Sequence, residues 1–443
     1  MAQLIHAANP RPRLGISYKL PVIFAGNKNA QGEVRKILEE KVDLSIIDNL
    51  RPTLDKENLL PAREKIHDLF LEHVMQQAPG YNKLMSWTDA PIMPTPGAVG
   101  LIMQTISRLE DIQVVGVDIG GATTDVFSVF KEMVDEEPQP TFNRTVSANL
   151  GMSYSISNVF AEAGIDNVIR WIPFKMDHRE LRNQVKNKMI RPTTIPQQLE
   201  TLVFEQALAR EALRLAFIHH KSFATKLKGV QKERDISEAF SQTDIDTLVN
   251  MMELDMIIGS GGVLSHAPRR HQSALMMIDS FEPQGITRLT VDSIFMMPQL
   301  GVLSTLHDQA ALDVFHKDCL IYLGTSVVPV GLTKVGKPVM DYKIDLPSGK
   351  VEGTLVFGEM KLFELGVGEK AKAELKPVRG FDIGNGSGKN METELHGGVV
   401  GIILDGRGRP LIISNDEETR VNDLLTWFKE LKVYPTELLT NQE

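Results

Sequence analysis

The chain has 443 residues, more than one hydrophobic core usually accommodates, so we expect two or three subdomains. Its net charge of −9 argues against non-specific nucleic-acid binding, which needs clustered Lys and Arg. No apolar run approaches the ~20 residues of a membrane span and the start has no signal-peptide pattern, so we expect a cytoplasmic protein with no membrane contact.

A single cysteine, Cys319, narrows the chemistry further. One cysteine forms no intrachain disulfide and cannot ligate an iron–sulfur cluster within a single chain. Its apolar surroundings at 318–323 favour a small buried strand residue over a nucleophile. The sequence also shows no convincing nucleophile–base pair and no redox-cofactor signature.

The first part of the chain indicates alternating strands and helices. Apolar stretches near 21 and at 44–47 predict strands. Helical patterns cover 33–40 and 61–77, and the second begins with proline in a favourable first turn. A proline-rich link then leads to a helix over 98–109, and we assign residues 1–111 to a first domain.

A glycine-rich loop between the apolar runs 114–117 and 126–130 indicates a β-hairpin on a core sheet. Glycine accepts positive φ, so backbone N–H groups can converge on an anion, and two threonine hydroxyls add donors. Two carboxylates beside a phosphate argue for Mg²⁺ between them, held largely through water. The predicted phosphate and metal residues are Asp118, Gly120, Gly121, Ala122, Thr123, Thr124 and Asp125.

This motif has a plainer interpretation, because short glycine motifs also match by accident. The loop would then be a hairpin turn with two solvated aspartates. Gly151, in the segment 148–156 after the hairpin, would either bring backbone close to a nucleotide or merely turn the chain.

Beyond a mainly helical region at 172–250, whose clearest helix is 198–224, a second glycine turn begins after the apolar run 255–258. Glycines there would let a flat base and ribose lie against the main chain, and a following helix N-terminus would favour a phosphate. A plain turn is the alternative. The predicted adenosine contacts are Gly259, Ser260, Gly261 and Gly262.

From about 321 the sequence changes to short β-rich segments, such as 350–357 and 401–404. We assign 112–330 to a second domain and 331–443 to a separate β-rich domain that ends in an amphipathic helix. A turn with Arg407 and Arg409 is expected to be exposed, either as a plain turn or as a binding site for a carboxylate or phosphate.

The order and spacing of these motifs resemble the superfamily of actin, sugar kinases and DnaK-type chaperones, in which 118–125 is similar to the second phosphate motif and 258–262 to the adenosine motif. Within it, the sequence most resembles the MutL, or GlmL, accessory proteins of adenosylcobalamin-dependent glutamate (methylaspartate) mutase. The similarity covers nearly the whole chain. It rests on the segments 21–27, 94–99, 118–125, 209–214, 258–262 and 397–410.

The resemblance implies an α/β fold of the actin-like, ribonuclease H-like ATPase type, with an incomplete first lobe and an additional C-terminal β-rich domain. It implies ATP or ADP with Mg²⁺ as cofactors, and Glu211 and Arg214 near the adenine, with a solvated helix face as the alternative. Ala122 stands where many members have a third glycine. The implied role is a chaperone-like, reactivating accessory protein whose partners are mutase subunits.

The superfamily's first phosphate motif, an N-terminal Asp-x-Gly-Ser/Thr loop, has no counterpart before Pro21. We expect a truncated form, or a natural short version that binds nucleotide weakly, and therefore poor hydrolysis. Two other functions stay open. One is an ATP-dependent hydantoinase or oxoprolinase subunit, which uses a similar loop, and the other is a degenerate ATPase-fold scaffold that does not hydrolyse ATP.

Overall fold

The computed structural model describes residues 2–8, 19–53, 58–73, 79–88, 90, 92–134, 137–225 and 247–435. The described residues group into two compact units, one within residues 1–93 and one made of 94–225 and 247–435. The expected helix at 98–109 and the expected C-terminal domain both belong to the larger unit. The three-domain division at 111 and 330 stays a prediction.

The smaller unit contains two parallel strands and their connecting helix. Strand β1 (Pro21–Phe24) pairs with β2 (Asp43–Ile46), and α2 (Gln31–Leu38) connects them. The buried side chains of Val34, Leu38 and Val42 form the core of this unit. Residues 74–77 of the expected second helix lie outside the described residues. The remaining elements of this unit are α1 (Ala2–Ala8), η1 (Lys28–Ala30), α3 (Leu60–His73) and α4 (Tyr81–Met85).

The larger unit is built on an eight-stranded sheet with the order β11-β14-β8-β7-β6-β3-β4-β5. The predicted hairpin is confirmed, because β3 pairs with β4 in antiparallel fashion and β5 extends the meander. Strands β6 and β7 continue the sheet parallel to β3. The strands of this sheet are β3 (Val114–Ile119), β4 (Thr124–Val134), β5 (Glu137–Ser147), β6 (Met256–Ser260), β7 (Gly285–Asp292), β8 (Leu320–Val328), β11 (Met360–Phe363) and β14 (Gly401–Asp405).

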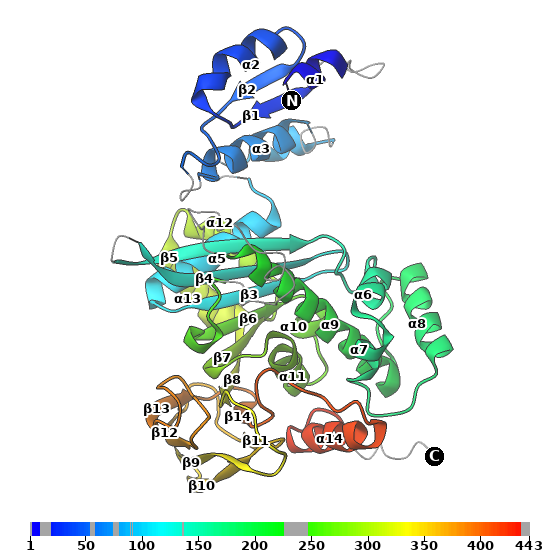
Figure 1. Cartoon of the computed structure of the whole chain (residues 1–443), viewed down its shortest axis with the longest axis vertical. Coiled ribbons are helices and arrows are strands. Elements are labelled where there is room, and N and C mark those ends of the chain that lie inside the picture. Colours follow the sequence, from blue (N-terminus) through cyan, green and yellow to red (C-terminus); the bar gives the residue numbers. More distant parts are fainter. Residues whose placement is uncertain are drawn as a thin grey trace, which may run out of the picture. The chain divides into compact units, whose positions relative to one another are not determined.

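The order β5-β4-β3-β6-β7, with three antiparallel strands followed by two that run parallel to β3, is that of a ribonuclease H-like sheet. The expected fold class is therefore confirmed. Helices α5, α12 and α13 lie together beside the β3–β5 part of the sheet, while α9 lies alongside α11 and also packs against β4 and β5 (Figure 1). The helices of the unit are α5 (Thr95–Glu110), α6 (Ile156–Ala163), α7 (Ile165–Ile169), α8 (His178–Ile190), α9 (Leu199–Phe223), η3 (Met251–Glu253), α10 (Gly262–Ser265), α11 (Arg270–Phe281), α12 (Met297–Ser304), α13 (Asp308–Val314), η4 (Phe315–Cys319) and α14 (Glu417–Glu430).

Alternation along the central strands assigns side chains to two cores. On β3, Val115 and Val117 belong to one buried cluster, while Val114 belongs to the other. On β6, Ile257 belongs to the same cluster as Val115, and Ile258 belongs to the same cluster as Val114. This is the pattern of a sheet covered on both faces, and the two glycine turns follow the ends of β3 and β6.

The C-terminal region contributes to two sheets. Strands β10, β9, β12 and β13 form a four-stranded antiparallel sheet, whereas β11 and β14 join the large sheet through the parallel pairing of β14 with β8. Helix α14 buries Trp427 and Phe428 in the largest core, as its apolar face predicts. None of the described helices is both long and apolar enough to cross a bilayer. The strands of the smaller sheet are β9 (Pro338–Leu346), β10 (Gly349–Val356), β12 (Lys370–Pro377) and β13 (Met391–His396).

Candidate functional site

The β3–β4 loop lies directly against the segment that follows β5. The amides of Met152 and Ser153 donate to the carbonyls of Gly120 and Gly121, each at 2.9 Å. A Cβ on Gly151 would stand 2.4 Å from the carbonyl carbon of Ala122, so only glycine permits this approach. Gly151 thus lets these two loops approach each other, and its expected approach to a nucleotide stays a prediction.

The second glycine turn closes against the end of the neighbouring strand. Gly261 has a φ of +106°, and a Cβ there would lie 2.1 Å from the carbonyl oxygen of Ile119. The turn therefore needs glycine for both its conformation and its contact. The helix expected after the turn is a single turn, Gly262–Ser265, so the expected helix-dipole contribution to phosphate binding has little physical basis.

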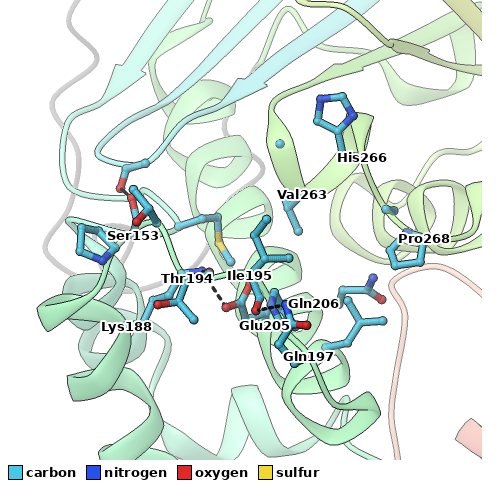
Figure 2. A pocket seen from close by; sticks show the side chains of 18 of the residues that line it. Ser153, Lys188, Thr194, Ile195, Gln197, Glu205, Gln206, Val263, His266 and Pro268 are labelled. Atoms are coloured by element: carbon cyan, nitrogen blue, oxygen red, sulfur yellow. Dashed lines mark hydrogen bonds and ion pairs between the residues drawn. The ribbon is translucent and has the colours of Figure 1, made fainter.

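A cavity of about 560 Å³ opens where these two turns meet the segment between α8 and α9 (Figure 2). Gly120, Gly121 and Gly262 of the predicted site line it. Sequence reasoning missed the rest of the polar lining, which comes mainly from α8, α9 and their connection, with Ser153 from the segment after β5 and His266 from the end of α10. These polar lining residues include Ser153, Lys188, Thr194, Gln197, Glu205, Gln206 and His266.

An ion pair lies in the cavity wall. The Nζ of Lys188 is 2.7 Å from Oε1 of Glu205, and the same amine donates to the carbonyl of Thr194. Burial raises the pKa of Glu205, and Lys188 opposes that shift. Lys188 thereby tethers the α8–α9 connection to α9 and fixes that side of the cavity (Figure 2).

The two aspartates of the hairpin face each other across β3 and β4, because Asp118 and Asp125 are register partners. Burial raises both pKa values, and the charge of Asp118 adds to the effect at Asp125, whose pKa reaches about 6. Oδ1 of Asp125 is buried and has no hydrogen-bond partner among the described residues. No group of three potential metal ligands occurs in the described part of the chain, so a metal here would depend on these two carboxylates, water and ligand oxygens.

The threonines of the motif point elsewhere. The Thr124 hydroxyl, fully buried, donates to the carbonyl of Leu150, and the Thr123 hydroxyl donates to Asp125 at 3.3 Å. Asp118, Ala122, Thr123, Thr124 and Asp125 do not belong to the cavity lining. The structure therefore brings the glycines of the predicted motif to the cavity and places its acids and hydroxyls beside it.

Glu211 and Arg214 lie away from the cavity, Glu211 fully buried and Arg214 partly exposed. Glu211 is fully buried and accepts hydrogen bonds from Arg170 at 2.7 Å, from the Trp171 indole at 2.8 Å and from Arg214 at 2.8 Å. The alternative of a solvated helix face is wrong for Glu211, because its carboxylate is buried and paired with the guanidinium groups of Arg170 and Arg214, which are partly exposed. Gly259 and Ser260 are buried within β6.

The turn with Arg407 and Arg409 is also buried, against expectation. Arg407 is 3% exposed and Arg409 4% exposed, and both guanidinium groups bind Asp405 at 2.9 Å. Arg407 further contacts Asp279 at 2.9 Å. These arginines hold the end of β14 against α11 and are not available to a partner's carboxylate or phosphate.

A sequence profile of the family described as MutL protein matches residues 1–319. The chain belongs to the MutL family. The matched region of this MutL-family protein contains every residue that lines the cavity and ends where β8 begins. Protein MutL of Clostridium tetanomorphum is 26% identical over 325 residues, which cover 68% of this chain and 66% of that protein.

Among solved structures, component A of (R)-2-hydroxyglutaryl-CoA dehydratase from Acidaminococcus fermentans matches 53% of this chain and 74% of its own. The identity is 9% and the TM-score 0.25, which is too low to bear on function. The ribonuclease H-like assignment of this MutL-family chain therefore rests on its own strand order.

Proposed function

We propose that this MutL-family protein binds ATP or ADP with Mg²⁺ in the cavity between its two glycine turns. The observation that carries the proposal is the cavity itself, which has about 560 Å³ and opens at the ends of the neighbouring strands β3 and β6. Small-molecule sites typically have about 300–1,000 Å³, so a nucleotide is within range.

The glycine end of the cavity suits phosphate oxygens. The amides of Gly121 and Ala122 make no hydrogen bond within the described part of the chain, so they are free to donate. Converging backbone N–H groups at a glycine turn attract anions. Oδ1 of Asp125 is buried and unpartnered on the hairpin that carries this loop, and we propose that a cation-bound water binds it and neutralises the charge of the phosphates.

The family supports an accessory role toward an adenosylcobalamin-dependent mutase. Walls of the cavity come from the hairpin, the second glycine turn, and α9 with its preceding segment, so a bound nucleotide would contact several elements at once. A ligand that fits one arrangement of such walls better than another shifts the population toward it. We propose that nucleotide state is transmitted in this way to mutase subunits, which release damaged cobalamin.

One observation favours a non-hydrolysing version of this function. Glu205 is the one carboxylate among the described residues that line the cavity, and Lys188 holds it in an ion pair. A general base must be free to accept a proton from the attacking water. Binding of nucleotide without turnover therefore stands as a second candidate.

Calorimetric titration with Mg-ADP and Mg-ATP tests the proposal. Val263→Trp would fill the cavity that Val263 lines, and we expect it to abolish binding. The control is Val335→Trp at a valine that is 81% exposed, which should bind as the unmodified chain does. Failure of the unmodified chain to bind either nucleotide would leave only a nucleotide-free scaffold.

The accessory role needs a separate assay with the holoenzyme of a glutamate mutase carrying damaged cobalamin. We expect this chain plus Mg-ATP to restore mutase activity when fresh adenosylcobalamin is supplied, and Val263→Trp to fail. ATP turnover measured in the same reactions separates the hydrolysing from the non-hydrolysing version. ADP release that depends on a cyclic amide would instead favour the hydantoinase-type alternative.

A further inference from the structure

A second, smaller cavity lies at the other ends of β3 and β6, away from the glycine turns. Its volume is about 240 Å³, and its lining includes Ile112, which precedes β3, and Asp255, which precedes β6. Arg288 of β7, Thr325 of β8 and the strand residue His396 add polar groups from three strands. A cavity lined by charged and polar groups on rigid strands needs an explanation of its own.

Arg288 forms no close ion pair among the described residues, although its charge acts on the carboxylate of Asp255 and its guanidinium hydrogen-bonds the Tyr322 side chain. Its Nε is buried without a hydrogen-bond acceptor, and its guanidinium lies 5.1 Å from the centroid of the Tyr322 ring. The two carboxylates in the lining are already engaged. Asp255 accepts from the amide of Gln113 at 2.7 Å, and Glu394 pairs with Lys370 at 2.6 Å. A half-buried guanidinium whose Nε has no acceptor, and which no carboxylate contacts directly, is suited to bind a further oxygen ligand.

The Tyr322 ring that supports Arg288 is itself held by a series of side-chain contacts. The Tyr322 hydroxyl is 2.5 Å from Nδ1 of His316, whose Nε2 contacts Glu110. These groups come from β8, η4 and α5, so the aromatic ring under the guanidinium is fixed by three elements. A cation positioned on a fixed ring is preorganised for binding, because little rotamer freedom remains to be lost.

His396 completes the surroundings as an uncharged group. Burial lowers its pKa, and the charges of Arg288 and Lys370 lower it further, whereas Glu394 opposes the shift. At neutral pH a neutral imidazole offers one N–H donor and does not compete with Arg288 for an anion. The Thr325 hydroxyl is already satisfied by the backbone of His396, because it accepts a hydrogen bond from the His396 amide and donates one to the His396 carbonyl.

We propose that this cavity binds a small oxyanion, either a carboxylate or a phosphate, with Arg288 as its anchor. The guanidinium fork matches both groups through two parallel N–H donors. The cavity has less than half the volume of the nucleotide cavity, which restricts it to small ligands. The proposed anion site is distinct from the nucleotide cavity, because the two cavities share no lining residue.

Calorimetric titration of the full chain with inorganic phosphate and, separately, with glutarate tests the proposal and distinguishes the two sources of oxyanion. We expect at least one to bind, and Arg288→Gln to weaken that binding by about tenfold or more, since a charge-assisted bond is lost. Arg108→Gln is the control, because Arg108 forms an ion pair at the surface and is 56% exposed. Lack of binding by both anions, or equal binding by Arg288→Gln, would overturn the site.

Two further variants test the role of Arg288 in anion binding if Arg288→Gln does not fold. Arg288→Lys keeps the charge but loses the fork, so weaker binding than in the unmodified chain is expected. Glu394→Gln removes a repelling carboxylate without touching Arg288, and it should tighten binding about two- to threefold if the anion lies beside it. Unchanged affinity in both variants would contradict the proposal.

Discussion

At the scale of single residues, Asp125 links stability to the candidate site. Burial and the charge of Asp118 raise its pKa from 3.8 to about 6. A carboxyl group with a raised folded-state pKa is more protonated in the folded state than in the unfolded state, so stability falls as pH rises from about 4 to about 6. We expect Asp125→Asn to be more stable than the unmodified chain by about 1–3 kcal/mol at pH 7.5, and equal to it near pH 4.

Urea unfolding at the two pH values measures this difference. Glu352→Gln, at an exposed position of β10, serves as the control and should change stability at neither pH. The same Asp125 variant should lose the Mg²⁺ dependence of nucleotide affinity. A variant that is no more stable at pH 7.5 would mean that the carboxylate finds a partner in solution.

His220 acts in the opposite direction over a similar pH range. Burial lowers its pKa from 6.5 to about 4, and the neutral ring bonds to Ser128 at 2.8 Å and Thr145 at 3.0 Å. The unfolded chain takes up the proton first, so this contribution to stability is lost as pH falls from about 6.5 to about 4. We expect His220→Gln to flatten the acid side of the stability curve.

The measurement for His220 is urea unfolding at half-unit steps between pH 4 and 7. Because Asp125 and His220 have opposite slopes, their contributions partly cancel in the unmodified chain. The comparison therefore uses the Asp125→Asn background, which removes the opposing slope of Asp125, and reads the effect of His220→Gln as the difference between the two variants. A His220→Gln variant with an unchanged slope would show that another group controls the acid transition.

The individual residues also show where sequence reasoning stops. Gly120, Gly121 and Gly262 could be named in advance because a glycine turn at a strand end is a local signal. Lys188 and Glu205 could not, because they belong to different helices and meet only in the folded chain. The sequence does not indicate whether a hydroxyl such as that of Thr124 faces a ligand or, as it does in this fold, the carbonyl of Leu150.

At the scale of elements, the buried ion cluster joins α9, α11 and the end of β14. Arg210 of α9 and Arg407 both bind Asp279 of α11, and Asp405 neutralises Arg407 and Arg409. Burial alone would raise the pKa of Asp405, but its two arginine partners lower it far below the ordinary range. The sequence indicated an exposed turn, because Arg, Gly and Pro typify surfaces and the partner on α11 is distant in sequence.

We expect Asp405→Asn to destabilise the protein by about 3–5 kcal/mol, because it leaves two guanidinium groups buried without their shared counter-ion. The matched control is Asp345→Asn, which removes the partner of Lys350 from a surface pair with 68% and 44% exposed side chains. That loss should be about 0–1 kcal/mol. Denaturant midpoints of both variants provide the comparison, and equal losses would show that the cluster is not tightly coupled.

Element type was easier to predict than strand partnership. The hairpin, α9, β10 and α14 were all indicated by local periodicity, and each is present. The expected C-terminal β-rich region contributes strands to two sheets, because β11 and β14 pair with the large sheet, and its status as a separate domain stays a prediction. Which edge a short strand joins depends on contacts made across the whole fold, and alternation within the strand does not encode it.

At the scale of the whole molecule, the described residues contain separate hydrophobic cores. Val34, Leu38 and Val42 centre a small core in the first unit, with no member from the larger unit. The three other cores lie in the larger unit and share strands of its eight-stranded sheet. Units with separate cores unfold in separate transitions, whereas cores on one sheet unfold together.

We therefore expect two transitions in differential scanning calorimetry of the full chain, a small one for the first unit and a large one for the second. Saturating Mg-ADP should raise only the larger transition, because all residues that line the nucleotide cavity belong to that unit. Ligand at about 100 times its Kd contributes about 2.7 kcal/mol to the folded state. A single transition that shifts as a whole would instead mean that the two units unfold together, so that nucleotide binding stabilises both of them.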